Sequence, residues 1–134
     1  MTSSHACPIR VYYEDTDAGG VVYHSNYLNF AERARTEMLR DSGFEHANLL
    51  HEEGIGFAVR RLNIDYNSPA RLDEHLIVYT QVISLSGVRI TMKQDIIRED
   101  NVLAEVEVEL VCVSPEGKAT RLPKGLYNLL KAEV

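Results

Sequence analysis

One stretch of this chain has the periodicity of a helix, and most of the chain after it has the periodicity of strands. In residues 26–42, Tyr27, Ala31, Ala34 and Met38 repeat at spacings of three and four, which predicts an amphipathic helix. Such a helix is roughly 26 Å long, enough to lie across a whole small sheet. The helix must therefore share its apolar face with whatever the later segments form.

The period changes to two after Gly56. The clearest case is residues 104–110, where small and branched apolar residues alternate with three glutamates, as in a strand with one buried face. The segment 75–85 is apolar on both faces, which predicts a central strand covered on both sides. Three further stretches are typical of strands: 9–13, 57–66 and 88–93. One strand, one long helix and then four or five antiparallel strands predict an α+β fold, and the open sheet edges favour an oligomer.

Composition restricts the classes of function. The 134 residues predict one domain over 1–134, and a formal charge of −6 argues against general nucleic-acid binding. Cys7 and Cys112 lack metal-ligand spacing, so reduced thiols are expected. The first residues, MTSSHACP, have no signal pattern, and no apolar run approaches the length of a membrane span. We therefore expect a cytoplasmic protein without an integral membrane segment.

The chemistry-bearing residues gather in the loop just before the helix. Asp15 and Asp17 lie two apart, Gly19 and Gly20 follow, and His24 comes seven residues after Asp17. A helix N-terminus carries unpaired N–H groups and a partial positive charge, so it can stabilise developing negative charge. A carboxylate and an imidazole beside such a terminus suit acyl-bond hydrolysis. From composition alone, however, aspartate and glycine also make an ordinary turn.

Other catalytic or metal-binding motifs fail on single residues. A calcium loop is excluded because Gly19 occupies its fifth position and Asn26 its twelfth. Ile55 stands where the second histidine of H-E-x-x-H belongs, so no metal is expected. Ser25 lies in no G-x-S-x-G elbow, and Cys112 replaces the first glycine of a phosphate loop.

The loop and its continuation resemble the hot-dog-fold thioesterases of the 4-hydroxybenzoyl-CoA thioesterase group. The resemblance is carried by YYEDTDAGGVVYHSNY at 12–27, and ERARTEMLR at 32–40, PARLD at 69–73 and VCV at 111–113 narrow it to the YbgC branch. It implies a hot-dog fold, a long central helix wrapped by a curved antiparallel sheet of five or six strands. It also implies a cofactor-free acyl-CoA thioesterase associated with the Tol-Pal system. The expected assembly is a homodimer, often paired into a tetramer, with acyl carrier protein as a further partner.

The same resemblance implies the catalytic residues. Asp17 becomes the expected general base or nucleophile toward a thioester carbonyl, and His24 its expected partner. The 4-hydroxybenzoyl-CoA type differs at the histidine, which makes His24 a marker of the subgroup. Asp15 is interpreted as shaping the loop.

The substrate contacts are predicted from the same region and from one hairpin. Tyr13, Tyr23, Asn26 and Tyr27 are expected to line the acyl pocket or orient the loop, and Arg89 is the favoured contact for coenzyme A phosphates. The alternative function is a non-catalytic module that binds acyl-CoA or acyl carrier protein. A hot-dog dehydratase is disfavoured because Asp17 and His24 precede the helix.

Overall fold

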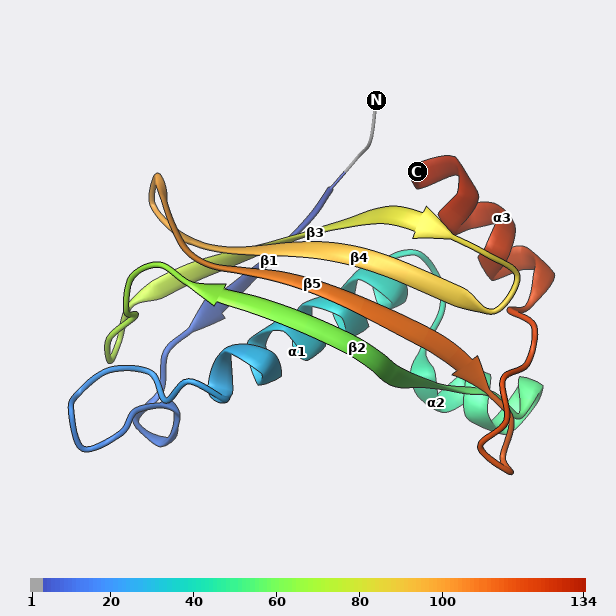
Figure 1. Ribbon diagram of the computed structural model, residues 1–134, viewed down its shortest axis with the longest axis horizontal. Helices are drawn as coiled ribbons and strands as arrows, with labels where there is room; N and C mark the ends of the chain where they lie inside the picture. The colour runs from blue at the N-terminus through green and yellow to red at the C-terminus, as the bar shows by residue number, and fades with distance from the viewer. Residues whose placement is uncertain (1–3) are drawn as a thin grey trace.

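A single antiparallel sheet and one long helix form the body of the protein (Figure 1). The computed structural model describes residues 4–134. The strand order is β1-β3-β4-β5-β2, and the expected five or six strands are five. The strands are β1 (His5–Arg10), β2 (Gly56–Tyr66), β3 (His75–Leu85), β4 (Arg89–Arg98) and β5 (Asn101–Val113). The helices are α1 (Asn26–Asp41), α2 (His46–Asn48) and α3 (Lys124–Glu133), with a 3₁₀ turn at Tyr13–Asp15 and a π-helical turn at Leu49–Glu53.

Helix α1 forms where the helical periodicity predicts it. Its apolar side, which includes the fully buried Phe30 and Ala34, packs against β1, β3 and β4. The helix ends at Asp41, and Gly43 follows in a left-handed conformation, with φ 96°, that favours glycine. Figure 1 shows α1 running along the sheet, with the loop of residues 11–25 at one end and α2 and α3 near the other. The two ends of α1 therefore differ in what surrounds them.

The alternation in β5 is confirmed. Ala104, Val106 and Val108 are buried, whereas Glu107 between them is exposed. Double coverage of β3 is contradicted within one chain, because Tyr79 and Ile83 on its outer face are more than a third exposed. The long helix lies on one face of the sheet only, so the other face of β3 lacks a covering layer from residues 4–134.

The first strand begins and ends earlier than predicted. The sequence pattern placed it at residues 9–13, but β1 spans His5–Arg10 and pairs with β3. Residues 13–15 leave the strand because Asp15 caps a 3₁₀ turn there, and its carboxylate accepts the N–H of Tyr12 at 2.8 Å. Residues 1–3, part of the stretch expected to lack a signal, lie outside the described residues.

The two edge strands differ in how open they are. β1 has six residues and contains Pro8, which has no N–H to donate to another strand. β2 has eleven residues, and most of its side chains are exposed, including Val59 and Tyr66.

Over residues 4–134, none of the helices has both the length and the apolar character that crossing a bilayer requires.

Candidate active site

Asp17 lies at the start of a tight turn that the chain closes on itself. The N–H of Asp17 donates to Val21 O at 2.9 Å, and the N–H of Gly20 donates to Asp17 O at 3.0 Å. Gly20 takes a φ of 79°, which a residue with a side chain rarely adopts. The carboxylate of Asp17 accepts the N–H of Gly19 at 2.8 Å. The turn thus fixes the direction of the Asp17 side chain while leaving it exposed.

Asp15 anchors this loop to α1. It is only 3% exposed, and its second carboxylate oxygen accepts the side-chain N–H of Asn26 at 3.0 Å. Its backbone oxygen accepts the N–H of Tyr23 at 2.9 Å. The interpretation of Asp15 as a loop-shaping residue is confirmed. Through this hydrogen bond Asn26 helps to orient the loop, and its expected contact with the acyl group stays a prediction.

His24 lies beside a hollow of about 310 Å³ at the N-terminal end of α1. Its backbone oxygen accepts the hydroxyl of Tyr66 at 2.8 Å, and the Tyr66 ring meets the rings of His24 and Tyr27 edge-on. The hollow is lined by Val22, His24, Tyr27, Tyr66, Asn67, Ser68 and Pro69. Tyr66 was missed as a site residue, since its place at the end of a strand pattern gave no sign that it would reach the helix.

The two phenols of this hollow stay neutral over a wide pH range. Loss of hydration is the main cause that raises the pKa of Tyr27 and that of Tyr66. The Tyr27 hydroxyl accepts the N–H of Ala70 at 3.0 Å, so it ties α1 to the segment after β2. Tyr27 is buried and structural, yet part of its surface lines the hollow. That this hollow receives the acyl group stays a prediction.

The other predicted residues are only partly brought together. Asp17 does not line the hollow, and among residues 4–134 no hydrogen bond or ion pair joins its side chain to His24. Tyr23 lies against His24 with ring centroids 4.5 Å apart, whereas Tyr13 is 83% exposed. Arg89 begins β4 at the far end of the sheet, where it lies 3.5 Å from Glu109. Within one chain, Arg89 and the Asp17 loop are therefore separated by the length of a strand.

The N-terminus of α1 has no side chain as its cap. Ser25 occupies the cap position without a side-chain hydrogen bond, and the N–H groups of Asn26 and Leu28 donate to the backbone oxygens of Tyr23 and Ser25. The first turn of α1 contains no acidic residue. The partial positive charge of the helix therefore meets no carboxylate from its own first turn.

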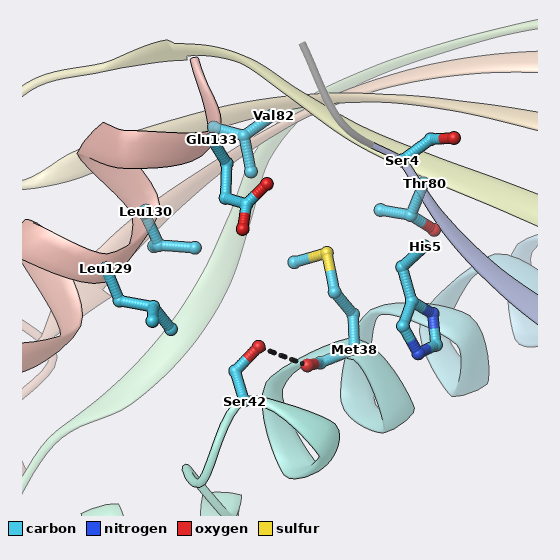
Figure 2. Close-up of a pocket in the computed structure, with 9 residues that line it drawn as sticks. All are labelled: Ser4, His5, Met38, Ser42, Thr80, Val82, Leu129, Leu130 and Glu133. Carbon is cyan, nitrogen blue, oxygen red and sulfur yellow. Dashed lines mark hydrogen bonds between the residues drawn. The ribbon is translucent and has the colours of Figure 1, made fainter.

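A second hollow of about 170 Å³ lies near the other end of α1 (Figure 2). Met38, Val82 and Leu130 form apolar walls, and the polar residues around it include His5 and Glu133. No residue predicted for the site lines this hollow. It lies apart from the loop that carries Asp17.

Comparison with known proteins defines the class. The profile of the Thioesterase-like superfamily matches residues 11–130. The acyl-CoA thioester hydrolase YbgC of Escherichia coli O6:H1 is 48% identical over 126 residues, covering 92% of this chain and 93% of the relative. The acyl-CoA thioesterase YbgC of Haemophilus influenzae is 49% identical over 113 residues, covering 84% and 83%.

Solved structures agree with this class. A probable thioesterase from Bartonella henselae superposes with a TM-score of 0.88 at 41% identity, covering 90% of this chain and 100% of that one. The DHNA-CoA thioesterase from Staphylococcus aureus gives a TM-score of 0.88 at 28% identity, covering 96% and 89%.

The fold and these matches define a hot-dog thioesterase, which confirms both the predicted fold and the predicted class of thioester hydrolase. The chain belongs to the Thioesterase-like superfamily, and its resemblance to the YbgC acyl-CoA thioesterases is confirmed.

Proposed function

We propose that this protein hydrolyses acyl-CoA to a free acid and coenzyme A, with Asp17 as the reacting carboxylate. The observation that carries the proposal is the exposed Asp17 carboxylate, held in a tight turn that Asp15 anchors to the N-terminus of α1. The acyl-CoA activity named for the YbgC relatives supports the choice of substrate.

Two routes fit a carboxylate at this place. In one, Asp17 takes a proton from water as the water attacks the thioester carbonyl carbon. In the other, an Asp17 oxygen attacks that carbon, coenzyme A leaves as the thiolate, and water then hydrolyses the acyl anhydride. Both routes place negative charge on the carbonyl oxygen, which the N-terminus of α1 stabilises; one such donor is worth roughly 3 kcal/mol of barrier. His24 positions Asp17 or the water, or protonates the leaving thiolate.

A second copy of the chain is needed to close the site, because over residues 4–134 Asp17 is exposed and does not line the hollow beside His24. Strand β2 suits such pairing: it is a long exposed edge, whereas β1 is short and contains Pro8. Antiparallel pairing about Arg61, the middle residue of β2, would set Gly56 of one copy opposite Tyr66 of the other. The assembly we propose is thus a homodimer, and the exposed outer face of β3 offers a surface for a tetramer.

This pairing also brings Arg89 back into the site. Arg89 pairs in register with Val111 at the end of the sheet where β2 begins. In the dimer that end approaches the His24 hollow of the other copy. We propose that Arg89 contacts coenzyme A phosphates across the two copies, and that Tyr13 and Tyr23 meet the substrate beside Asp17.

The deciding experiment measures thiol release from acyl-CoA by wild-type protein and by Asp17→Asn. Hydrolysis should fall by at least about a hundredfold, while stability stays close to wild type because asparagine can still accept the N–H of Gly19. Asp100→Asn, in the exposed turn between β4 and β5, serves as the matched control and should keep full activity. His24→Ala should lose most of the activity. Full turnover in Asp17→Asn would refute the role of Asp17, and binding without turnover in the wild type would favour a non-catalytic module.

The wider context is drawn from the YbgC resemblance. We propose that the enzyme is cytoplasmic, is associated with the Tol-Pal system and also binds acyl carrier protein. Comparing hydrolysis of acyl groups carried by acyl carrier protein with that of the same groups on coenzyme A tests this partner. A specific contact would be refuted if acyl carrier protein bound no more tightly than a non-cognate acidic protein of similar size, and if its acyl groups were hydrolysed no faster than the same groups on coenzyme A.

A further inference from the structure

Arg35 is buried on the inner face of α1. It is only 8% exposed, although charged residues at neighbouring positions of the helix, such as Glu32 and Arg33, face outward. A charged side chain of an amphipathic helix is expected on the polar side, but Arg35 lies on the buried side. Its position, four residues after Ala31 and three before Met38, places it on the apolar stripe.

The guanidinium is held from one side by a fixed amide. Arg35 Nη1 donates to Gln94 Oε1 at 3.0 Å. The amide nitrogen of Gln94, itself fully buried, donates to Ala31 O at 2.8 Å and to Thr80 Oγ1 at 2.9 Å. These two acceptors fix the orientation of the Gln94 amide, so its oxygen must face Arg35.

The charge of Arg35 lacks a counter-ion. Over residues 4–134, no carboxylate oxygen lies within 4.0 Å of its nitrogens. Burial lowers the pKa of Arg35, and the negative charge of the exposed Glu32 counteracts this to a smaller extent. A guanidinium has five N–H donors and is costly to bury without an anion, and the hydrogen bond to Gln94 accounts for one of these donors.

The free side of Arg35 faces a cavity of about 60 Å³, room for a group of a few heavy atoms. Its walls are apolar, and its other polar lining residues, Glu32 and His46, are exposed. Partial loss of hydration where the His46 ring faces the cavity lowers its pKa below the ordinary 6.5, so the ring is mostly neutral at neutral pH. Among the lining residues, Arg35 is then the only full cation. The lining comprises Glu32, Arg35, Leu39, His46, Phe57, Val59, Ile90, Met92 and Leu110.

We propose that this cavity binds a carboxylate at the far end of the acyl group, so that Arg35 selects short dicarboxylic acyl-CoA thioesters. The inference rests on the proposed thioesterase function and on the pairing of β2. In that pairing, Phe57 and Val59 of one copy lie beside the Tyr66 end of the other. An acyl group held at the N-terminus of α1 in one copy can then extend toward Arg35 of the other.

The ligand carboxylate supplies the direct ion-pair partner that Arg35 lacks, since Glu32 lines the cavity without reaching the guanidinium. It accepts two N–H groups of the guanidinium side by side and neutralises the buried charge. The apolar walls suit a short methylene chain between the thioester and the carboxylate. A neutral acyl group of the same length leaves Arg35 without an anion.

The test compares binding and turnover over matched pairs of ligands. For binding, calorimetry uses thioether analogues of coenzyme A, in which a methylene replaces the thioester carbonyl, with a terminal carboxylate or a methyl group. For turnover, succinyl-, glutaryl- and adipoyl-CoA are compared with the neutral acyl-CoA of equal carbon number. We expect at least one carboxylate analogue to bind the wild type about tenfold or more tightly than its neutral match, and kcat/KM to show the same preference.

Two variants assign the preference to Arg35. Arg35→Met keeps the bulk and removes the charge, so the ratio between matched ligands should fall to about one; Arg35→Lys should keep part of it. Arg33→Met, on the exposed side of the same helix, is the matched control and should keep the full ratio. Circular dichroism and thermal unfolding check that each variant folds.

The outcomes separate this inference from the proposed function. Turnover of neutral acyl-CoA without any carboxylate preference in the wild type would overturn the role of Arg35 and leave the thioesterase assignment intact. A carboxylate preference that survives in Arg35→Met would also overturn it. Tighter binding of a carboxylate analogue with no turnover of any thioester would support the cavity and refute the hydrolase.

Discussion

Removing the Asp15 carboxylate should destabilise the protein more than any change at Asp17. Asp15→Ala leaves two donors without their acceptor, the N–H of Tyr12 and the side-chain N–H of Asn26. Hydrogen bonds to a charged group are worth about 1.5–3 kcal/mol each. Tyr12 is exposed and Asn26 half-buried, so water can reach both donors and reduce the loss. We therefore expect Asp15→Ala to lower the free energy of unfolding by about 2–4 kcal/mol.

A double-mutant cycle isolates the contact between Asp15 and Asn26. Asn26→Ala alone should cost about 1–2 kcal/mol, and the double variant should cost less than the sum by about 1–2 kcal/mol, because each single change already breaks the same bond. Urea unfolding followed by circular dichroism, at one fixed protein concentration, measures all four proteins.

The reasoning has a clear failure point. If Asp15→Ala costs less than about 0.5 kcal/mol, or if the two changes add within that margin, Asp15 does not anchor the loop. Activity provides the contrast: Asp15→Ala should lose stability and activity together, whereas Asp17→Asn should lose activity alone.

Three further predictions concern the turn, the thiols and the sheet edge. Gly19→Ala would place a Cβ 3.1 Å from Asp17 Oδ1, so hydrolysis should fall several-fold while the free energy of unfolding stays within about 0.5 kcal/mol of the wild type. At Gly20 a Cβ would meet nothing within 4 Å, but φ is 79°, so Gly20→Ala should instead lower the free energy of unfolding by about 1 kcal/mol. Burial raises the pKa of Cys7 and Cys112 above the ordinary 9.0, so on raising the pH the unfolded chain loses these protons before the folded one, and the urea midpoint should fall above about pH 9. The Cys7→Ala, Cys112→Ala double variant should show a smaller fall of the midpoint, and a fall as large as that of the wild type would contradict this cause. Val59→Lys on the exposed edge of β2 should shift the sedimenting mass from a dimer toward the 15.1 kDa monomer, and an unchanged dimer would exclude β2 pairing.

Local pattern was enough to locate the main helix and most strands. The helix predicted over 26–42 is Asn26–Asp41, and the alternation at 104–110 lies in β5 with the expected face buried. The first strand was misplaced because the apolar run through Tyr13 hid a capped turn. A side-chain cap formed by Asp15 depends on where its donors lie in space, and periodicity does not record that.

The sequence by itself determined the period of each element, the loop before α1 and, through resemblance, the class of the protein, since these depend on residues close together along the chain. Only the tertiary structure decided that Asp15 is buried and Asp17 exposed, that Tyr66 meets His24, and that Arg35 lies inside against Gln94. Tyr66 and His24 are 42 positions apart in the sequence, and Arg35 and Gln94 are 59 apart. The register of the sheet and the rotation of the helix about its axis decide whether such distant residues meet. The local sequence pattern around a charged residue on an apolar stripe is the same whether its charged group reaches solvent or lies in a cavity. Tertiary packing therefore decides where the charged group lies.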